Sequence, residues 1–588
     1  MPIPSGAIVA YFSMEICLEQ AIPTYSGGLG VLAGDTLRAA ADLEVPMIAV
    51  TLLHRKGYFT QTLDPDGQQH EAPVTWNPEN VLKAEKARAS VEIAGRRVEI
   101  RAFRYDVRGA GGHVVPVYLL DTNLEENSEW DRTLTDCLYG GDMHYRLCQE
   151  VVLGMGGAAL LEAMGYADRA QYHINEGHAA LLTLTLLERE MAGQAPRDIT
   201  EADLERVRRR CIFTTHTPVP AGHDRFDVFE TKSVLGDARW QMLVDARIIE
   251  DNTLNMTHLA LRLSRYVNGV AMRHREISQG MFPDYPIDSI TNGVHATTWT
   301  AQSFQELFDK RIPEWRRDNQ YLRYAIDIPL EEILDAHAAT KAALFTEVHH
   351  RTGVKLDPAV LTIGFARRAT PYKRADLIFS DIKRLAAIAE RSGRIQLLFG
   401  GKAHPRDEGG KTLIKQIFAA AASLPSSVHV VYIENYEMDI AHLMTAGVDL
   451  WLNNPTKPLE ASGTSGMKAA LNGVPSYSVL DGWWVEGCID GVTGWSIGAA
   501  RSDEGEEIAD LYVKLERVIL PLFYGLPFSW AKVMRNSIAL NGSFFNTQRM
   551  VGQYVHNAYF PPKDQRTIPV AAAENAKEDV QSAWAGVQ

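Results

Sequence analysis

The segment Val448-Asp-Leu-Trp-Leu452 is followed, seven residues later, by Glu460-Ala-Ser-Gly-Thr-Ser-Gly-Met-Lys468-Ala-Ala-Leu-Asn-Gly473. The apolar run predicts a buried strand, and the small residues at the start of the second segment let backbone amides approach a ligand closely. Residues 467–471 predict the first turn of a helix, which Asn472-Gly473 ends. A strand, a small-residue loop and a helix N-terminus in this order form an anion site, because free N–H groups and the helix dipole face one point. Lys468 lies one turn from that point, which indicates a lysine that serves a phosphate-bearing ligand.

The second half of the chain repeats this order of strand and helix upstream of Val448. Apolar runs predict strands at 360–365, 394–399 and 428–433, and helical patterns alternate with them at 375–391, 412–422 and 439–446. Strands separated by helices of this length predict a parallel, doubly wound sheet. Two more helices are expected near the C-terminus, at 531–540 and 548–558.

The first half begins with a similar unit. A core strand is expected at 7–12, the turn Tyr25-Ser-Gly-Gly-Leu-Gly30 follows, and a helix at 31–43 leads to a strand at 45–53. The turn lies where α/β sheets bind ligands. Its glycines do not match the dinucleotide fingerprint G-x-G-x-x-G, so it either binds a phosphate or is only a tight turn. Further strands are expected at 89–103 and 114–120, and a long helix at 142–164.

At 588 residues the chain is too long for one hydrophobic core. The fold class is therefore α/β, with two Rossmann-like doubly wound domains that face a central cleft lined by strand ends. The predicted division is an N-terminal domain over 1–300, a C-terminal domain over 301–545 and a helical tail over 546–588. The charged residues 301–358, with helices expected at Trp315-Arg-Arg and 336–351, predict a connection between the domains.

Composition excludes several classes of protein. A net charge of −14 argues against a nucleic-acid or anionic-membrane surface, since both need a basic face. No run is long enough to span a bilayer, and the first residues lack the positive region of a signal peptide. The five cysteines are odd in number and never spaced C-x-x-C, which favours reduced thiols and a cytoplasmic protein. The histidines near strand ends lack metal-ligand spacing, so no metal is expected; they are His173, His178, His216 and His223.

A basic loop occupies the first strand–helix junction of the second domain, Ala366-Arg-Arg-Ala-Thr-Pro-Tyr-Lys-Arg374. Four basic residues at the end of a strand form a candidate clamp for two phosphates. The alternative is a solvated basic loop. The acidic balance of the whole chain and the position of the loop in an α/β sheet favour the clamp.

At this point the sequence resembles the α-glucan (glycogen, maltodextrin) phosphorylases. The segment from Glu460 to Gly473 looks like their pyridoxal-phosphate attachment motif. Other stretches match the family in the same order over roughly residues 9–545, namely Tyr11-Phe-Ser-Met-Glu15, Gly27-Gly-Leu-Gly30, the strand end at His216, Thr291-Asn-Gly293, Arg367-Arg368 with Tyr372-Lys-Arg374, Gly400-Gly-Lys-Ala403 and Glu434-Asn-Tyr436. The resemblance implies the GT-B glycosyltransferase architecture and reversible phosphorolysis of α-1,4-glucans, with retention, to α-D-glucose 1-phosphate.

By motif position, the resemblance also implies the roles of individual residues. Lys468 would bind pyridoxal 5'-phosphate covalently, and Thr464, the Ser465 amide, Arg367 and Tyr436 would contact that cofactor. The substrate phosphate would meet Arg368, Lys373 and the Gly28 amide. Glucose hydroxyls would meet the Leu29 amide, the His216 carbonyl, Asn292, Tyr372, Glu460 and the backbone of Ala461, Ser462 and Gly463. In these enzymes the cofactor's phosphate, and not its ring, exchanges a proton with inorganic phosphate.

The chemistry of such a site agrees with these assignments. Two phosphates held close together repel each other, and permanent cations offset that repulsion. Arg367, Arg368 and Lys373 supply three cations on one loop. With the repulsion partly offset, one phosphate can keep a proton and act as an acid toward the other.

Some features depart from the family pattern. The core strand starts so early that no N-terminal regulatory extension is expected, and residues 120–149 leave little room for a long dimer-contact helix. We therefore expect a constitutively active enzyme without phosphorylation control, while the preferred glucan length, any allosteric effector and homo-oligomerisation stay open. Glu437 replaces a basic residue of many members, which leaves open whether it alters cofactor binding.

Two other functions remain as alternatives. A retaining GT-B transferase that uses a sugar nucleotide often carries two glutamates eight positions apart, whereas here the pair is Glu460 and Lys468. A non-catalytic glucan-binding protein would keep the fold but would have no need for several buried cations in one place.

Overall fold

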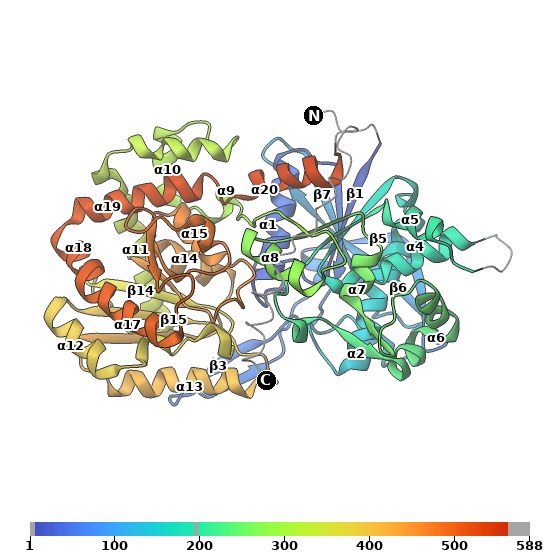
Figure 1. The fold of residues 1–588 in the computed structure, drawn as a ribbon, viewed down its shortest axis with the longest axis horizontal. Coiled ribbons are helices and arrows are strands. Elements are labelled where there is room, and N and C mark those ends of the chain that lie inside the picture. The colour runs from blue at the N-terminus through green and yellow to red at the C-terminus, as the bar shows by residue number, and fades with distance from the viewer. Residues whose placement is uncertain (1–5, 193–197, 562–588) are drawn as a thin grey trace.

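The computed structural model describes residues 6–192 and 198–561. Within these ranges the chain forms two halves side by side, each built on its own sheet (Figure 1). The N-terminal half has nine strands in the order β13-β12-β9-β8-β1-β2-β7-β6-β5, and the C-terminal half has six in the order β16-β15-β14-β17-β18-β19. This arrangement confirms the expected α/β fold with two doubly wound domains. The part of the expected tail after residue 561 lies outside the described residues.

Most strands of the nine-stranded sheet are parallel. They are β1 (Ile8–Ser13), β2 (Met47–Leu52), β7 (Val114–Asp121), β8 (Ala170–Asn175), β9 (Cys211–Thr214), β12 (Tyr266–Gly269) and β13 (Asp288–Ser289). Every residue of β2 is buried, because helices cover both faces of the sheet. The apolar runs seen in the sequence follow from this double cover.

The edge of this sheet differs from the expectation. The run at 89–103 is not one strand but a hairpin of β5 (Lys83–Ile93) and β6 (Arg96–Arg108), and β6 pairs antiparallel with β7. The hairpin turns at Ala94 and Gly95, whose φ angles are 51° and 71°. Two positive φ values in a two-residue loop match the right-handed twist of the strands. The turn was missed because alanine is not a typical residue for that conformation.

Helices cover the two faces of the N-terminal sheet. One face carries α1 (Gly28–Asp42) and the late helix α20 (Thr547–Tyr554). The opposite face is covered mainly by α2 (Met143–Val151), α3 (Gly157–Ala163), α4 (Leu182–Met191), α5 (Glu201–Arg208), α6 (Val228–Asp245) and α7 (Met256–Arg262). A π-helical turn at Val152–Gly156 joins α2 to α3, so the expected helix at 142–164 is essentially continuous. The short strands β10 (Arg225–Asp227) and β11 (Thr253–Asn255) form a separate ribbon, and α8 (Met272–Met281) and α9 (Ala296–Trp299) follow.

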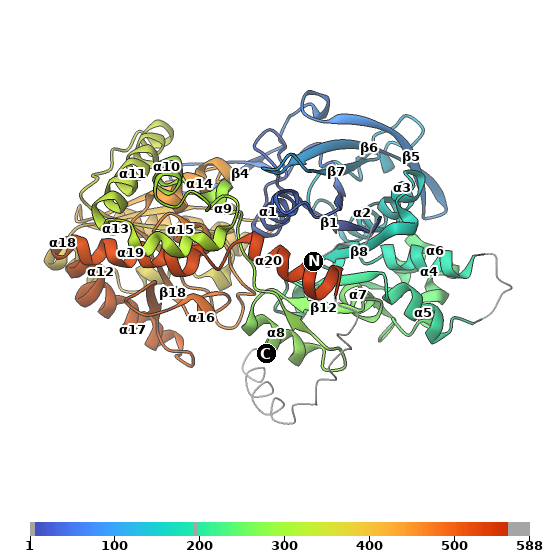
Figure 2. The same cartoon turned by 90° about the horizontal axis from the view of Figure 1, so that it is seen from above.

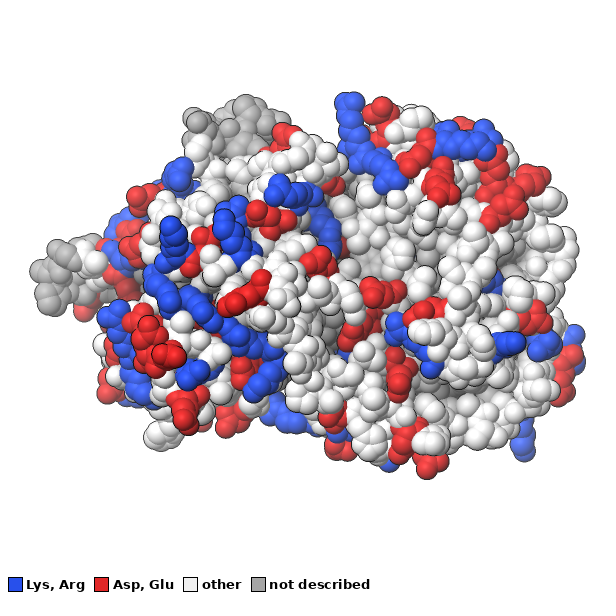
Figure 3. Space-filling model, turned by 180° about the vertical axis from the view of Figure 1, so that it is seen from behind, with Lys and Arg blue, Asp and Glu red and all other residues white. Residues whose placement is uncertain are grey.

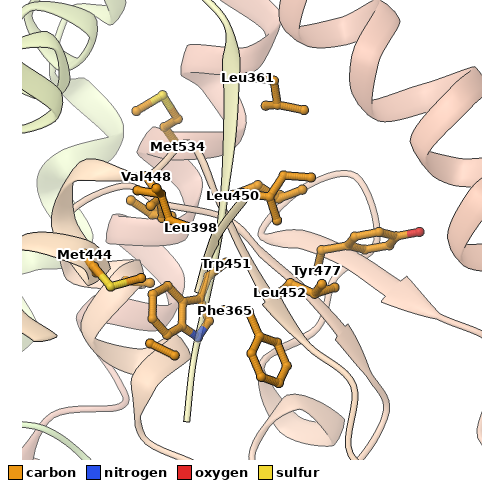
Figure 4. Close-up of a cluster of buried hydrophobic side chains, with 14 of the residues drawn as sticks. Leu361, Phe365, Leu398, Met444, Val448, Leu450, Trp451, Leu452, Tyr477 and Met534 are labelled. Carbon is orange, nitrogen blue, oxygen red and sulfur yellow. The ribbon is translucent and has the colours of Figure 1, made fainter. Parts of the chain in front are cut away.

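All strands of the six-stranded sheet are parallel. They are β14 (Leu361–Ala366), β15 (Ile395–Gly400), β16 (Val428–Ile433), β17 (Leu450–Asn453), β18 (Ser476–Val479) and β19 (Gly494–Ile497). The helices between and after them are α12 (Ile382–Ser392), α13 (Glu408–Ser423), α14 (Met438–Gly447), α15 (Ser465–Leu471), α16 (Trp484–Gly487) and α17 (Glu504–Lys514). Figure 4 shows part of the core, where Phe365, Leu398 and Trp451 project from adjacent strands among Val448 and Met444.

Two expectations in this half are wrong in detail. The helix expected at 375–391 begins only at Ile382, because Arg374 is left-handed with a φ of 49° and Asp381 caps the helix by accepting the Arg384 N–H. Trp315-Arg-Arg is a turn and not a helix, since Pro313 ends the preceding α10 (Gln302–Arg311). The Trp315 side chain is fully buried and donates to Asp309 over 2.7 Å.

The expected connection at 301–358 belongs to the C-terminal core. Helix α10, the 3-10 helix at Asn319–Asp327 and α11 (Leu330–Thr352) contribute buried side chains to the same cluster as the six-stranded sheet. Near the end of the chain, α18 (Leu520–Gly525) and α19 (Pro527–Asn536) also lie on this half, and a π-helical turn follows at Ser537–Gly542. The chain then crosses back to α20 on the N-terminal half, as Figure 2 shows. The domain boundaries given above stay a prediction.

A small hairpin ties the two halves together. Strands β3 (Thr60–Leu63) and β4 (Gln69–Ala72) leave the N-terminal half and reach the loops that follow β15 and β16. Buried Gln61 donates to the Gly401 carbonyl over 3.0 Å, and buried Gln69 donates to the Ala403 carbonyl over 2.9 Å. Such satisfied buried amides fix the spacing of the halves on this side of the cleft.

Candidate active site

Lys468 lies on α15 at the end of the strand–loop–helix unit that opens with β17. Its side chain is buried, and its ammonium nitrogen is 3.7 Å from the centroid of the Trp299 ring on α9, which packs into the same hydrophobic core. No hydrogen bond or ion pair to this ammonium exists in the described ranges. Burial lowers the pKa of Lys468 to about 8, although Asp35 and Cys17 act in the opposite direction. A buried amine that is easily deprotonated is suited to bind an aldehyde.

The ring beside Lys468 is fixed by polar contacts. The Trp299 indole N–H donates to Asp35 on α1 over 2.7 Å, and the Asp35 carboxylate also accepts the His295 N–H. Asn472, at the end of α15, donates to the Trp299 carbonyl over 2.8 Å and to the Lys468 carbonyl over 2.9 Å. Lysine and ring are therefore held by one network that spans both halves.

The basic loop after β14 divides into two parts. Arg367 donates to Glu460 and Asn453, and the Lys373 ammonium lies 2.6 Å from the same Glu460 oxygen. Burial acts to raise the pKa of Glu460, but the two cations outweigh it and lower that pKa to about 2. Glu460 is therefore a carboxylate at neutral pH, and the triad carries a net positive charge.

The other two cations of the loop have different surroundings. The Arg368 side chain is exposed and interacts electrostatically with Glu15 and Tyr139 of the other half, but its guanidinium makes no hydrogen bond or ion pair with the residues described. Arg374 instead donates to the carbonyls of Asn454 and Pro455 and pairs with buried Glu507 at 2.6 Å. The sequence placed Arg374 in a phosphate clamp, but its contacts give it a structural role.

The glycine-rich turn lies at the start of α1 on the opposite half. A Cβ placed at Gly28 would meet nothing within 4 Å, so the backbone there is open to a ligand. Glu15 holds the turn from behind, because its carboxylate accepts the Ser26 hydroxyl at 2.7 Å and the Tyr139 hydroxyl at 2.5 Å. Burial raises the pKa of Glu15 despite these donors and the nearby Arg368. Leu29 is half-buried on the same turn.

Residues expected to meet a sugar approach from both halves. Asn292 is buried, and its Oδ1 atom has no partner within the described ranges. His216 follows β9, and its ring pairs with Asn175 at 2.8 Å; burial lowers its pKa to about 3, so the ring is neutral. The Tyr372 ring lies under the Lys373 ammonium at 4.3 Å.

The loop from Ala461 to Gly463 is set by the segment after β18. The Ser462 carbonyl accepts the Trp483 N–H at 2.9 Å, and Gly463 adopts a φ of 76°. Asp481 accepts the Glu460 N–H at 2.9 Å, and burial raises its pKa to about 7. The backbone around Ala461 is therefore held at both ends.

The residues expected to contact the cofactor differ in how firmly other protein groups hold their side chains. Thr464 precedes α15 without capping it, so its hydroxyl is free of the helix N–H groups, whereas the Ser465 hydroxyl accepts from Trp451 at 3.0 Å. The Tyr436 ring lies against Gly400, where a Cβ would be 2.9 Å from it. Glu437 pairs with Lys402 at 3.1 Å and with Gln20 of the other half, so its carboxylate joins the two halves.

Sequence reasoning missed several groups in this region. Glu176 adopts a φ of 69° and accepts the His216 N–H at 2.7 Å. Arg146, on α2, contacts Glu150 at 3.2 Å and Asp224 at 3.2 Å, while its guanidinium lies 4.6 Å from the Tyr139 ring. In the sequence this region was marked by the polar residues Asn175 and Glu176 at the end of β8, and they did not indicate which distant residues they contact.

The distribution of charged side chains and of potential metal ligands can be described for the same residues. Acidic and basic side chains are interspersed on the face that Figure 3 shows, rather than gathered into one basic surface. Among residues 6–192 and 198–561, no three His, Cys, Asp or Glu side chains are grouped to hold a metal ion. Over the same ranges, no helix has the length and apolar character needed to cross a membrane.

Comparisons with known proteins agree with this geometry. The model of the family described as carbohydrate phosphorylase matches residues 223–491. The chain is 40% identical to a maltodextrin phosphorylase of Thermococcus litoralis, over 94% of this chain and 70% of that protein. It is 38% identical to a glycogen phosphorylase of Mycobacterium tuberculosis (95% and 71% covered) and 35% identical to one of Aquifex aeolicus (94% and 86% covered).

Two facing Rossmann-like halves with cations and a buried lysine at their strand ends define a glycosyltransferase enzyme of the GT-B class. More closely, the chain belongs to the carbohydrate phosphorylase family. Members of this family generally depend on pyridoxal phosphate.

Proposed function

We propose that the protein catalyses the reversible phosphorolysis of α-1,4-glucans from their non-reducing ends and releases α-D-glucose 1-phosphate with retention. Glycogen and maltodextrin are the substrate class, because the relatives with the same architecture are named for them. The observation that carries the proposal is that Glu460, in the loop leading to the Lys468 helix, binds both Arg367 and Lys373, because the two loops follow the neighbouring parallel strands β17 and β14.

The residues fit pyridoxal 5'-phosphate as the cofactor. Lys468 offers a buried amine with a lowered pKa and no competing carboxylate partner among the described residues. No side chain caps the first N–H groups of α15. Arg367 donates to Glu460, which lies in the loop that leads into this helix. We assign the covalent bond to Lys468 and the phosphate contacts to Thr464, the Ser465 amide and Arg367, with Tyr436 beside the ring. When bound, the cofactor supplies a phosphate that can exchange a proton with the substrate phosphate.

The protein's own groups then bind and orient the substrates. Arg368 has no protein partner in the described ranges, so its charge is available to inorganic phosphate together with Lys373 and the Gly28 amide. Glu460, held as a carboxylate, accepts sugar hydroxyls, and Asn292 offers its unpaired oxygen to them. We assign the remaining sugar contacts to the Leu29 amide, the His216 carbonyl, Tyr372 and the backbone of Ala461, Ser462 and Gly463. These contacts hold the sugar so that phosphate attacks on one face.

The first experiment tests cofactor and reaction separately. Purified protein is reconstituted with pyridoxal phosphate, and borohydride reduction followed by peptide mapping should place the label on Lys468. The reconstituted protein should release phosphate from glucose 1-phosphate and a short maltodextrin. A protein that keeps no cofactor contradicts the proposal, and activity only with a nucleotide sugar would favour the alternative transferase.

A further inference from the structure

Asn292 lies in a loop whose backbone is hydrogen-bonded, but its buried side-chain oxygen has no partner within residues 6–192 and 198–561. Asn292 follows β13, and its N–H donates to the Val270 carbonyl at 3.0 Å. Its side chain is 4% exposed with an unpaired Oδ1 in the described part of the chain. A buried amide oxygen without a hydrogen-bond partner is costly unless a ligand donates to it. Since no donor among the described residues holds the Oδ1 atom, the direction of this side chain is set by the backbone that carries it.

Arg549 supports that backbone from the late helix α20. Its Nη1 lies 2.5 Å from the Thr291 carbonyl and its Nη2 lies 2.8 Å from the Asn292 carbonyl. The Nε donates to the Phe544 carbonyl at 2.9 Å, and a further Nη1 contact reaches Gln553. The guanidinium also lies 4.8 Å from the Phe544 ring. A planar fork that uses four of its five donors in fixed directions holds two successive carbonyls in a way that a lysine cannot.

This arginine has no counter-charge within ion-pair distance among the described residues. Burial lowers its pKa to about 10, although the charge of Glu486 acts in the opposite direction. Glu486 contacts the same loop from the C-terminal half, since its carboxylate accepts the Thr291 hydroxyl at 2.8 Å. Burying an arginine charge without a carboxylate partner is costly. The hydrogen bonds to the Thr291 and Asn292 carbonyls are the interactions that offset this cost.

The loop and the start of α20 are also packed closely. A Cβ at Gly293 would lie 2.3 Å from the Asn546 backbone. The Val294 N–H donates to the Phe545 carbonyl at 3.2 Å, and the Thr547 N–H donates to the Val294 carbonyl at 3.0 Å. A shift of α20 therefore moves residues 291–294 with it.

We propose that Arg549 is a positioning residue that fixes the Thr291 and Asn292 carbonyls and so aims the Asn292 side chain at the sugar. This inference rests on the proposed function, because it gives the sugar-binding loop its rigid backing. The Arg549 donors are engaged by the carbonyls of residues 291, 292 and 544 and by Gln553, so we assign it no direct contact with the sugar. Its effect on sugar binding must therefore pass through Asn292.

The test is a double-mutant cycle on the full-length, reconstituted enzyme. Arg549→Lys, Asn292→Ala and the double variant are compared with the parent by calorimetric binding of glucose 1-phosphate, by KM and kcat, and by thermal midpoint. Arg549→Lys keeps the charge and loses the fork, and we expect binding about tenfold weaker, the size of one charge-assisted hydrogen bond. KM for glucose 1-phosphate should rise more than kcat falls. In the Asn292→Ala background, Arg549→Lys should weaken binding little further.

Arg535→Lys is the matched control. Arg535, on α19, donates to the Ile328 carbonyl at 3.0 Å, also without an ion pair in the described ranges, but it lies away from the sugar loop. It should lower the thermal midpoint without changing the affinity for glucose 1-phosphate. Additive effects of Arg549→Lys and Asn292→Ala, or a lower midpoint with unchanged affinity, would overturn the inference. If the parent itself bound no glucose 1-phosphate, the proposed function would fail first, and the inference with it.

Discussion

The ammonium nitrogen of Lys468 lies 3.7 Å from the centroid of the Trp299 ring, and the indole N–H of Trp299 in turn donates to Asp35 of the N-terminal half over 2.7 Å. The ring attracts the cation, while burial disfavours it and dominates, so the pKa of Lys468 falls to about 8. The buried position of the amine beside this ring therefore prepares it to react with an aldehyde.

This relationship gives a pH dependence. Only the neutral amine attacks an aldehyde, and lowering the pKa means that Lys468 is neutral at a lower pH than an exposed lysine. Labelling of cofactor-free protein by pyridoxal phosphate should rise with pH and reach half its maximum near pH 8, against an ordinary pKa of 10.5. Rates of borohydride-trapped labelling over pH 6–10 measure this midpoint, and Lys468→Ala should remove the labelled peptide. A midpoint close to 10.5 would show that burial does not tune the amine.

The strand–loop–helix unit around Lys468 could be predicted because its signals are local. Apolar strand, small residues and helix follow one another within 26 residues, and both β17 and α15 form there. Partners far apart in sequence could not be predicted in this way. Trp299 meets Asp35 across 264 positions, and Lys373 meets Glu460 across 87. No periodicity predicts such pairings, since the first depends on how the two halves are placed and the second on β14 and β17 being neighbours in one sheet.

The same limit explains Arg374. On sequence it is one of four equivalent cations, whereas its left-handed φ of 49° turns its side chain toward Glu507 and two carbonyls. The missed hairpin turn at Ala94 has a related cause, because positive φ at a residue other than glycine leaves no clear mark in sequence.

The glycine turn separates stability from function. Gly28→Ala adds a Cβ that meets nothing within 4 Å, so the free energy of unfolding should change by no more than about 0.5 kcal/mol and the thermal midpoint should hardly move. Alanine keeps the backbone N–H, but its Cβ fills the open space beside it, so if the Gly28 amide binds phosphate the methyl group should obstruct the ligand and KM for phosphate should rise about tenfold or more, the value of one charge-assisted hydrogen bond. Gly34→Ala is the contrasting variant, because its Cβ would lie 2.0 Å from the Cys17 carbonyl oxygen. It should cost roughly 1–3 kcal/mol in stability. An unchanged KM in Gly28→Ala would remove that amide from the phosphate site.

Glu460→Gln tests the buried triad. It leaves the charges of Arg367 and Lys373 uncompensated and should destabilise the protein by about 3–5 kcal/mol at pH 7. The folded pKa of Glu460 is lowered to about 2, so its contribution is complete above the unfolded value and is lost as pH falls. The difference between parent and variant should therefore shrink from pH 5 toward pH 3 in urea midpoints. A difference that is constant over this range would mean that the charge of Glu460 does not matter.

The last prediction contrasts two arginines of one loop. Arg368 has no partner in the described ranges, so Arg368→Ala should leave the thermal midpoint nearly unchanged while KM for phosphate rises by about tenfold or more. Arg374→Ala removes two carbonyl contacts and one of the two cations that pair with buried Glu507, while Lys457 remains, and it should cost about 1–3 kcal/mol in stability. Its KM for phosphate should stay near the parent value at a temperature where the variant is folded. Scanning calorimetry and initial rates with varied phosphate measure both quantities. If Arg368→Ala destabilised the fold and left KM unchanged, the exposed guanidinium would serve the structure and another cation would have to bind the substrate.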